Sequence, residues 1–100
     1  MHLITYNLHK IIALCKKYNV KTLYVFGSIL NPRFNKNSDV DFSATFNHDS
    51  DPLVAGENLI EFYMALEDLM GRRIDLVYED SLRNPYFIEE LNETKKLIYG

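Results

Sequence analysis

Two aspartates and a Gly-Ser pair are the residue types in this sequence best suited to phosphate chemistry. Gly27 and Ser28 directly follow the apolar run TLYVF, and ten residues separate Ser28 from the pair Asp39 and Asp41. Glycine lets the backbone approach an anion closely, and the N–H groups that begin a helix or turn favour negative charge. Carboxylates bind hard cations such as Mg²⁺. The pattern therefore predicts a site for phosphoryl or nucleotidyl transfer.

Asp39 and Asp41 are expected on one face of a strand, with Val40 on the other. Polar and apolar residues alternate from Asp39 to Phe46, so the apolar side chains point away from the aspartates. An isolated D-x-D more often marks a solvated strand face than a metal site. Here Asp75 adds a third carboxylate on the polar face of a later strand. Three carboxylates beside a phosphate-type turn favour a metal site, in which two Mg²⁺ ions about 3.5–4 Å apart would act.

The elements that must position these residues alternate between strand and helix. This alternation predicts an α/β domain, a small sheet backed by helices, with the strand directions left open. Strands are expected at 22–26, 39–46 and 73–78, and helices at 8–18, from 52 to 70 and from 85 onward. The final residues KKLIYG fit either a continuation of the last helix or a short strand. No linker divides the chain, so residues 1–100 are predicted to form one domain.

Capping residues mark the expected helix boundaries. Asn and Asp are favoured at N-caps, proline is favoured at the first helical position, and glycine often ends a helix. The sequence accordingly predicts N-caps at Asn7, Asp51 and Asn84 and helix ends at Asn19 and Gly71. Residues 31–38 carry a proline and three asparagines, which predicts a loop between the Gly-Ser pair and the aspartates.

Composition limits the classes of protein to which this chain can belong. The 100 residues are 47% hydrophobic and 25% charged, as expected of one compact domain. The net charge of −3 argues against a surface built mainly for nucleic acid, so no direct nucleic-acid binding is expected. Cys15 is the single cysteine, which predicts a reducing cytoplasm and no internal disulfide. No apolar run is long enough to cross a bilayer, so no membrane association is expected.

Other possible sites have less support. The P-loop and dinucleotide fingerprints G-x-x-x-x-G-K-[ST] and G-x-G-x-x-G are absent. His48, Asp49 and Ser50 are residue types of a catalytic triad, but adjacency in sequence is not triad geometry. The histidines lack metal-ligand spacing. Arg72 and Arg73 fit either surface solubility or contact with a nucleotide or partner, and the sequence leaves both interpretations open.

The chemistry-bearing residues resemble the minimal nucleotidyltransferases of the DNA polymerase beta superfamily. The resemblance is carried by Gly27-Ser28, ten intervening residues, Asp39-Val40-Asp41 and a later Asp75 within RRIDLVYEDSL, and it runs over almost the whole chain. It implies a mixed sheet in a palm-like core and Mg²⁺ held by the three aspartates. It further implies a nucleoside triphosphate, ATP, held partly by Gly27 and Ser28.

The resemblance also implies a function. Short proteins of this kind are similar to the antitoxin half of HEPN/MNT toxin–antitoxin pairs, in which the antitoxin transfers AMP from ATP to a tyrosine of a HEPN-type ribonuclease toxin. The implied enzyme is a Mg²⁺-dependent protein adenylyltransferase. Asp39 and Asp41 would hold both metals, and Asp75 would complete one site and help to deprotonate the acceptor hydroxyl. Because the chain is short, acceptor specificity would come from the partner toxin or from a homo-oligomer.

The loop after Ser28 departs from the family pattern. Family members usually continue with an Ala-Arg-Gly-like sequence, whereas Asn31 stands here in place of the Arg and Pro32 in place of the Gly. An Arg would neutralise triphosphate charge with a bidentate geometry that Asn lacks, and Arg33 is the available substitute. Two alternatives therefore stay open. One is a catalytically weak or inactive antitoxin that binds its partner directly; the other is transfer to a small molecule, which the absence of a second substrate domain disfavours.

Overall fold

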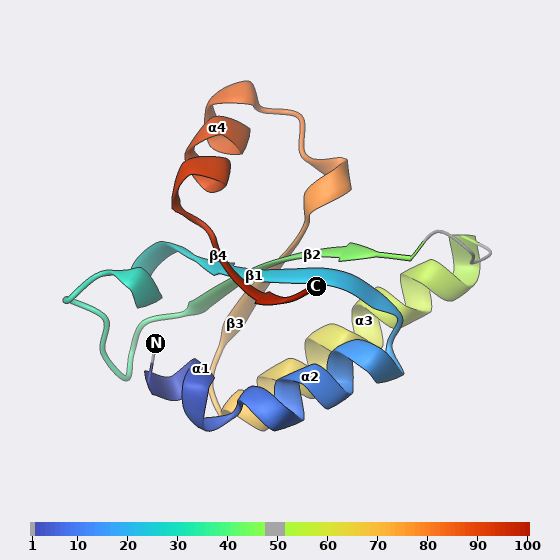
Figure 1. Cartoon of the computed structure of the whole chain (residues 1–100), viewed down its shortest axis with the longest axis horizontal. Helices are drawn as coiled ribbons and strands as arrows, with labels where there is room; N and C mark the ends of the chain where they lie inside the picture. The colour runs from blue at the N-terminus through green and yellow to red at the C-terminus, as the bar shows by residue number, and fades with distance from the viewer. Residues whose placement is uncertain (1, 48–51) are drawn as a thin grey trace.

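The computed structural model describes residues 2–47 and 52–100, in which helices and strands alternate along the chain (Figure 1). In chain order the elements are α1 (His2–Tyr6), α2 (Leu8–Lys17), β1 (Val20–Phe26), the 3₁₀ turn η1 (Gly27–Leu30), β2 (Val40–Phe46), α3 (Pro52–Met70), β3 (Ile74–Tyr78), the 3₁₀ turn η2 (Glu79–Ser81), α4 (Pro85–Thr94) and β4 (Lys96–Tyr99). The α/β class predicted from the sequence is confirmed.

The strands form one mixed sheet in the order β3-β2-β1-β4. β1 pairs antiparallel with both β2 and β4, whereas β2 and β3 run parallel. A parallel pair needs a long crossover connection, which α3 provides between β2 and β3. The residues after 95, for which the sequence allowed helix or strand, form the edge strand β4 beside β1.

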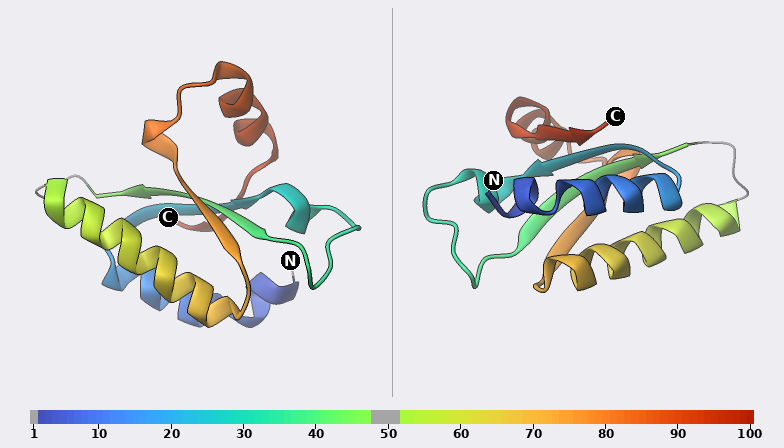
Figure 2. Two further views of the ribbon diagram at one scale, coloured as in Figure 1. Left: turned by 180° about the vertical axis from the view of Figure 1, so that it is seen from behind. Right: turned by 60° about the horizontal axis from the view of Figure 1, so that its bottom comes forward.

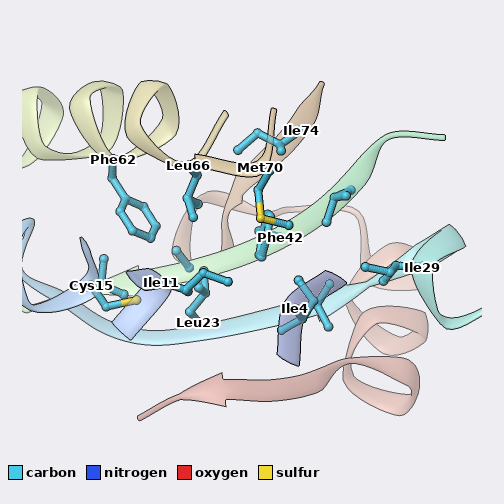
Figure 3. Close-up of a cluster of buried hydrophobic side chains, with 14 of the residues drawn as sticks. Ile4, Ile11, Cys15, Leu23, Ile29, Phe42, Phe62, Leu66, Met70 and Ile74 are labelled. Atoms are coloured by element: carbon cyan, nitrogen blue, oxygen red, sulfur yellow. The ribbon is translucent and has the colours of Figure 1, made fainter. Parts of the chain in front are cut away.

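Helices α2 and α3 cover one face of the sheet, and α4 lies on the opposite face (Figures 1 and 2). The main core lies between the sheet and the helices α2 and α3 (Figure 3). Phe42 of β2 and the α3 residues Phe62 and Leu66 are fully buried there. Burial of each such side chain contributes about 1.5–3 kcal/mol. The apolar face of β2 is thus held in this layer, which leaves its polar face directed toward the side of α4.

Two predicted helix boundaries are confirmed in detail. The side-chain oxygen of Asn84 accepts hydrogen bonds from the backbone N–H groups of Tyr86 (3.0 Å) and Phe87 (3.3 Å) and so caps α4. Gly71 follows α3 with φ 65°, and its N–H donates to the carbonyl of Glu67 at 3.0 Å. Within the described ranges, no helix is both long and apolar enough to cross a membrane.

The N-terminal boundaries differ in part from the prediction. The short helix α1 was not expected, and it changes the role of Asn7, whose side-chain amide donates to the carbonyl of Leu3 (2.9 Å) instead of capping α2. Helix α2 ends at Lys17, and Asn19 follows with φ 64°, a conformation that Asn tolerates better than most residues. The N-cap predicted at Asp51 lies outside the described residues.

Candidate active site

The sheet register places the predicted aspartates on adjacent strands. Asp41 in β2 is aligned with Asp75 in β3, and Phe26 at the end of β1 is aligned with Asp41 from the other side. Aligned residues of neighbouring strands project to the same face of a sheet. Asp39 immediately precedes β2, one position outside the strand in which the sequence placed it. The structure therefore places Asp41 beside Asp75 at the end of β1, and Asp39 is near enough for its charge to act on Asp41.

Gly27 closes this site from the β1 side. It begins η1 with φ 76°, in the left-handed region that favours glycine. A Cβ at this position would overlap the Oδ2 atom of Asp41 and lie 3.2 Å from its Cγ. The phosphate-type turn and the carboxylate predicted to hold metal are thus in direct contact, which the sequence alone did not indicate.

Ser28 binds both aspartates of the D-x-D pair. Its backbone N–H donates a hydrogen bond to the Asp41 carboxylate. Its hydroxyl donates to the backbone carbonyl of Asp39 at 3.1 Å. In this structure the hydroxyl that was expected to reach a phosphate is therefore engaged inside the protein, and its role toward a nucleotide stays a prediction.

Asp41 lies in an unfavourable electrostatic environment. Burial raises the pKa of the Asp41 carboxyl above its ordinary value, and the negative charges of Asp75 and Asp39 raise it further. The hydrogen bond from the Ser28 backbone opposes this rise in pKa. A cation bound among the three carboxylates would relieve their mutual repulsion.

The donor set fits Mg²⁺ in chemical type. Among residues 2–47 and 52–100, no three His, Cys, Asp or Glu side chains converge closely enough to enclose a metal ion as they stand. Mg²⁺, however, usually binds through one or two carboxylates, with water and substrate phosphates supplying the other oxygens. Asp39 remains accessible, because its carboxylate is half exposed and its neighbour Arg73 approaches only to 4.0 Å. Such an exposed ion pair contributes little stability and would not hinder a metal ion.

A pocket of about 430 Å³ lies beside the Gly-Ser turn, within the size range of small-molecule sites. One wall is the turn with the following loop, and the other wall is α4. The lining residues are Gly27, Ser28, Leu30, Asn31, Pro32, Glu90 and Thr94. The sequence did not predict Glu90 or Thr94, because only the tertiary structure brings α4 back over the end of β1.

The loop that departs from the family pattern is internally ordered. The side-chain oxygen of Asn31 accepts a hydrogen bond from the backbone N–H of Arg33 at 2.9 Å, and the carbonyl of Asn31 accepts one from Phe34 at 3.0 Å. Asn31 thus stabilises a turn. It lines the pocket, but it carries no charge that could offset a triphosphate.

A polar cluster on the face of the sheet that carries Asp41 was also not predicted. The buried hydroxyl of Ser43 donates to Glu79 at 2.9 Å, and Lys95 donates to the other oxygen of Glu79 at 2.7 Å. The Lys95 ammonium also lies 4.1 Å from the ring centroid of Tyr24. This cluster joins η2 and the start of β4 to the centre of the sheet. The alternating pattern marked Ser43 as polar, but no sequence signal identified its partners.

Comparison with known protein families agrees with this geometry. The family model described as "Polymerase beta, Nucleotidyltransferase" matches residues 9–100. The chain belongs to this family. The match covers α2 except its first residue and every later element through β4, including the turn at Gly27 and the three aspartates.

Sequence relatives of this chain include proteins of Methanocaldococcus jannaschii that are provisionally named protein adenylyltransferases. One is 37% identical over 84 residues, which cover 84% of this chain and 80% of the relative. A second is 33% identical over 83 residues, with coverage of 83% and 79%. The family resemblance inferred from the Gly-Ser and D-x-D spacing is therefore confirmed.

Solved structures share the fold of this chain. A crystal structure of a toxin–antitoxin complex with AMP-PNP matches with a TM-score of 0.71 at 23% identity, covering 94% of this chain and 73% of the other. A provisional minimal nucleotidyltransferase matches with a TM-score of 0.68 at 22% identity, covering 93% and 90%. A third neighbour is a tri-AMPylated Shewanella oneidensis HEPN toxin in complex with an MNT antitoxin, with a TM-score of 0.60, 22% identity and coverage of 96% and 71%.

Proposed function

We propose that this nucleotidyltransferase transfers AMP from ATP to a tyrosine of a HEPN-type toxin in a Mg²⁺-dependent reaction, and so acts as an antitoxin. The observation that carries the proposal is the close packing of Gly27, which lines a pocket, on Asp41, which is aligned with Asp75 on the neighbouring strand. The names of the sequence relatives support adenylyl transfer to a protein. The tri-AMPylated toxin bound to a structural neighbour supports the acceptor class.

The residues suggest how the reaction would proceed. The tyrosine oxygen of the acceptor attacks the α-phosphorus of ATP, in line with the departing pyrophosphate. A P–O bond to tyrosine forms, the bond to pyrophosphate breaks, and the phenolic proton passes to the exposed carboxylate of Asp75. Asp39 and Asp41 would hold two Mg²⁺ ions, with Asp75 completing one site. Bound Mg²⁺ supplies stabilisation of the charge on the phosphate oxygens.

Gly27 and Ser28 would hold the triphosphate. The absence of a Cβ at Gly27 leaves its backbone accessible from the pocket, and Ser28 lines the same pocket. To bind a phosphate oxygen, the Ser28 hydroxyl would exchange its bond to the Asp39 carbonyl for one to the nucleotide. Binding of ATP would then change the hydrogen bonding of the turn.

A protein acceptor is further supported by the outward face of α3. Ile60 and Met64 are 61% and 62% exposed, and they stand one helical turn apart. Phe62 and Leu66 of the same helix are buried in the core. Helix α3 is therefore apolar on two sides, a pattern typical of a helix that also contacts another protein.

The test is a transfer reaction with purified components. The chain is incubated with ATP labelled on the α-phosphate, Mg²⁺ and a purified HEPN-type toxin. We expect label on a tyrosine of that protein, none after addition of EDTA, and none with Asp41→Asn. A folded sample that leaves the HEPN-type protein unlabelled in the presence of Mg²⁺ would overturn the proposed activity.

A second candidate function is neutralisation by binding alone. It is favoured by the pocket beside Gly27, where the carboxylate-bearing Glu90 lies opposite the uncharged Asn31 and Pro32. Such a lining offers no positive charge to a triphosphate. Under this alternative, well-folded Asp39→Asn and Asp41→Asn variants would still protect cells from the toxin. Loss of protection in both variants would exclude it.

A further inference from the structure

Arg72 makes contacts that neither the family resemblance nor the proposed reaction uses. It follows Gly71 between α3 and β3, and its side chain reaches the loop that joins η1 to β2. One guanidinium nitrogen, Nη2, donates to the backbone carbonyls of Asn35 (2.6 Å) and Ser38 (2.5 Å). The guanidinium carbon lies 4.6 Å from the ring centroid of Phe34. A single side chain thus holds this loop at three successive points.

The loop has its own hydrogen bonds, but they are local. The backbone N–H of Asn35 donates to the Ser38 hydroxyl at 3.2 Å, and the N–H of Asn37 donates to the Asn35 side chain at 2.8 Å. Bonds between residues two or three apart shape the loop without fixing its position relative to the sheet. Phe34 packs against the core, and Arg72 adds hydrogen bonds that tie the loop to the connection between α3 and β3.

The link acts on the residues that flank Asp39. The Arg72 side chain holds the carbonyl of Ser38, and the carbonyl of Arg73 accepts the N–H of Val40 at 3.2 Å. Asp39 therefore lies between two residues, Ser38 and Val40, whose backbone groups are hydrogen-bonded to residues 72 and 73. Its own carbonyl accepts the hydroxyl of Ser28. The backbone of a predicted metal ligand is fixed on both sides and tied to the Gly-Ser turn.

One polar atom of the Arg72 side chain, Nε, is buried and is left without a hydrogen-bond partner among the described residues. A buried, unsatisfied donor is unfavourable. The planar guanidinium stacks on an aromatic ring and donates in a fixed geometry, which the flexible ammonium of lysine cannot reproduce. Arginine at position 72 can therefore make contacts that lysine cannot, although its Nε atom is left unsatisfied.

We propose that Arg72 is a positioning residue for the metal site, which fixes Asp39 in the orientation needed to bind Mg²⁺ without touching the metal or the nucleotide. The inference rests on the proposed function only in taking Asp39 and Asp41 as the metal ligands. Groups that orient a metal ligand from behind typically change metal affinity by about 10–100-fold when removed. Arg72 acts on the ligand's backbone, so its effect falls on metal affinity.

The test measures metal affinity and transfer separately. Mn²⁺ binding is followed by electron paramagnetic resonance without nucleotide, in the wild type and in Arg72→Ala, Arg72→Lys and the control Lys36→Ala, which removes an exposed cation from the same loop. We expect the Kd for Mn²⁺ to rise about tenfold in Arg72→Ala, less in Arg72→Lys, and by under about twofold in Lys36→Ala. AMP transfer by Arg72→Ala should recover at high Mg²⁺, with a kcat close to that of the wild type.

Further variants keep the inference falsifiable. If Arg72→Ala does not fold, Phe34→Leu removes the stacked ring but keeps both hydrogen bonds, and we expect it to weaken Mn²⁺ binding at an unchanged secondary structure. Unchanged Mn²⁺ affinity in a folded Arg72→Ala or Phe34→Leu would overturn the inference. So would Mn²⁺ binding that Asp41→Asn leaves intact, because the metal would then lie elsewhere. Weakened Mn²⁺ binding in an enzyme that transfers no AMP would support the inference and reject the proposed function instead.

Discussion

Gly27 and Asp41 lie so close together that the size of one side chain limits the position of the other. Asp41 Oδ2 occupies the space where any other residue at position 27 would place its Cβ. The positive φ of Gly27 adds a second reason for glycine. At the residue scale, the candidate site therefore depends on one missing side chain as much as on three carboxylates.

Gly27→Ala should destabilise the fold and reduce AMP transfer. The left-handed backbone at position 27 costs a residue with a Cβ about 1–2 kcal/mol. The added methyl group would also displace Asp41, and misplacement of a catalytic group commonly lowers kcat/KM by about 100-fold. Thermal unfolding and the transfer assay measure the two effects.

Gly56→Ala is the matched control for this substitution. A Cβ at position 56 meets nothing within 4 Å, and the residue lies within α3. Ala should there stabilise the helix by about 0.5–1 kcal/mol. If Gly27→Ala and Gly56→Ala unfolded at the same temperature and were equally active, the close packing of Gly27 on Asp41 would be wrong.

Asp41→Asn should raise stability at neutral pH while it abolishes AMP transfer. The folded-state pKa of Asp41 is raised by burial and by the charges of Asp75 and Asp39, so the unfolded chain releases this proton at lower pH. In the wild type, the contribution of Asp41 to the free energy of unfolding therefore falls as the pH rises from about the ordinary pKa of Asp through the raised folded-state pKa. Asn carries no charge, so the variant avoids this loss.

The measurement is the difference in unfolding free energy between Asp41→Asn and the wild type as a function of pH. We expect a small difference in acid that grows in favour of the variant as pH rises and then becomes constant. Transfer activity should drop by at least about 100-fold, because metal-assisted charge stabilisation is worth several kcal/mol. A variant less stable than the wild type at every pH would contradict the electrostatic account of Asp41.

At the scale of elements, α4 lies far from the main core and yet lines the pocket beside Gly27. Leu91 is its buried residue, and Phe87 meets the ring of Phe26 at 6.0 Å between centroids. Lys95 fixes the end of the helix through its bond to Glu79. With so little apolar burial, the formation of α4 depends strongly on its own capping.

Asn84→Ala should weaken α4 by about 1 kcal/mol, because it removes the side chain that accepts the N–H groups of Tyr86 and Phe87. Asn92→Ala, on the exposed side of the same helix, is the control and should be neutral or slightly stabilising. Amide hydrogen exchange within α4 measures the effect locally. Equal exchange rates in the two variants would show that the cap is not needed.

At the scale of the whole molecule, the candidate active site and the exposed apolar surface of α3 lie on different sides of the sheet. The pocket beside Gly27 is lined in part by α4, whereas the exposed apolar pair Ile60 and Met64 belongs to α3. Helices α3 and α4 lie on opposite faces of the sheet (Figure 2). Another pocket, of about 660 Å³, extends from Met64 to Arg73, whose guanidinium lies near Asp39. A partner bound along α3 could thus reach the carboxylate site around the edge of β3.

The double variant Ile60→Lys, Met64→Lys should weaken binding of the proposed HEPN-type partner by about tenfold or more, because it places two charges on the apolar surface proposed to contact that partner. Tyr86→Lys is the control, since Tyr86 is also strongly exposed but belongs to α4. Isothermal titration calorimetry gives both Kd values. If the control weakened binding and the α3 variant did not, the partner would contact the α4 side instead.

The sequence by itself determined the local features of this protein. Period-two alternation from Asp39 to Phe46 defined the polar face of β2, and helical spacing defined α2 and α3. Gly71 correctly marked the end of α3, and Asn84 correctly marked the start of α4. These features follow from burial and backbone geometry within a few neighbouring residues. The spacing of Gly27-Ser28 and the aspartates was also sufficient to identify the family.

The tertiary structure alone decided which of these residues touch. Strand order, the antiparallel position of β4 and the return of α4 over the turn depend on pairings between distant segments, for which local periodicity carries no signal. For the same reason the contact of Gly27 with Asp41 and the hold of Arg72 on the loop before Asp39 were not predictable. The sequence supplied the three carboxylates, and long-range packing placed Asp41 beside Asp75 and against the turn.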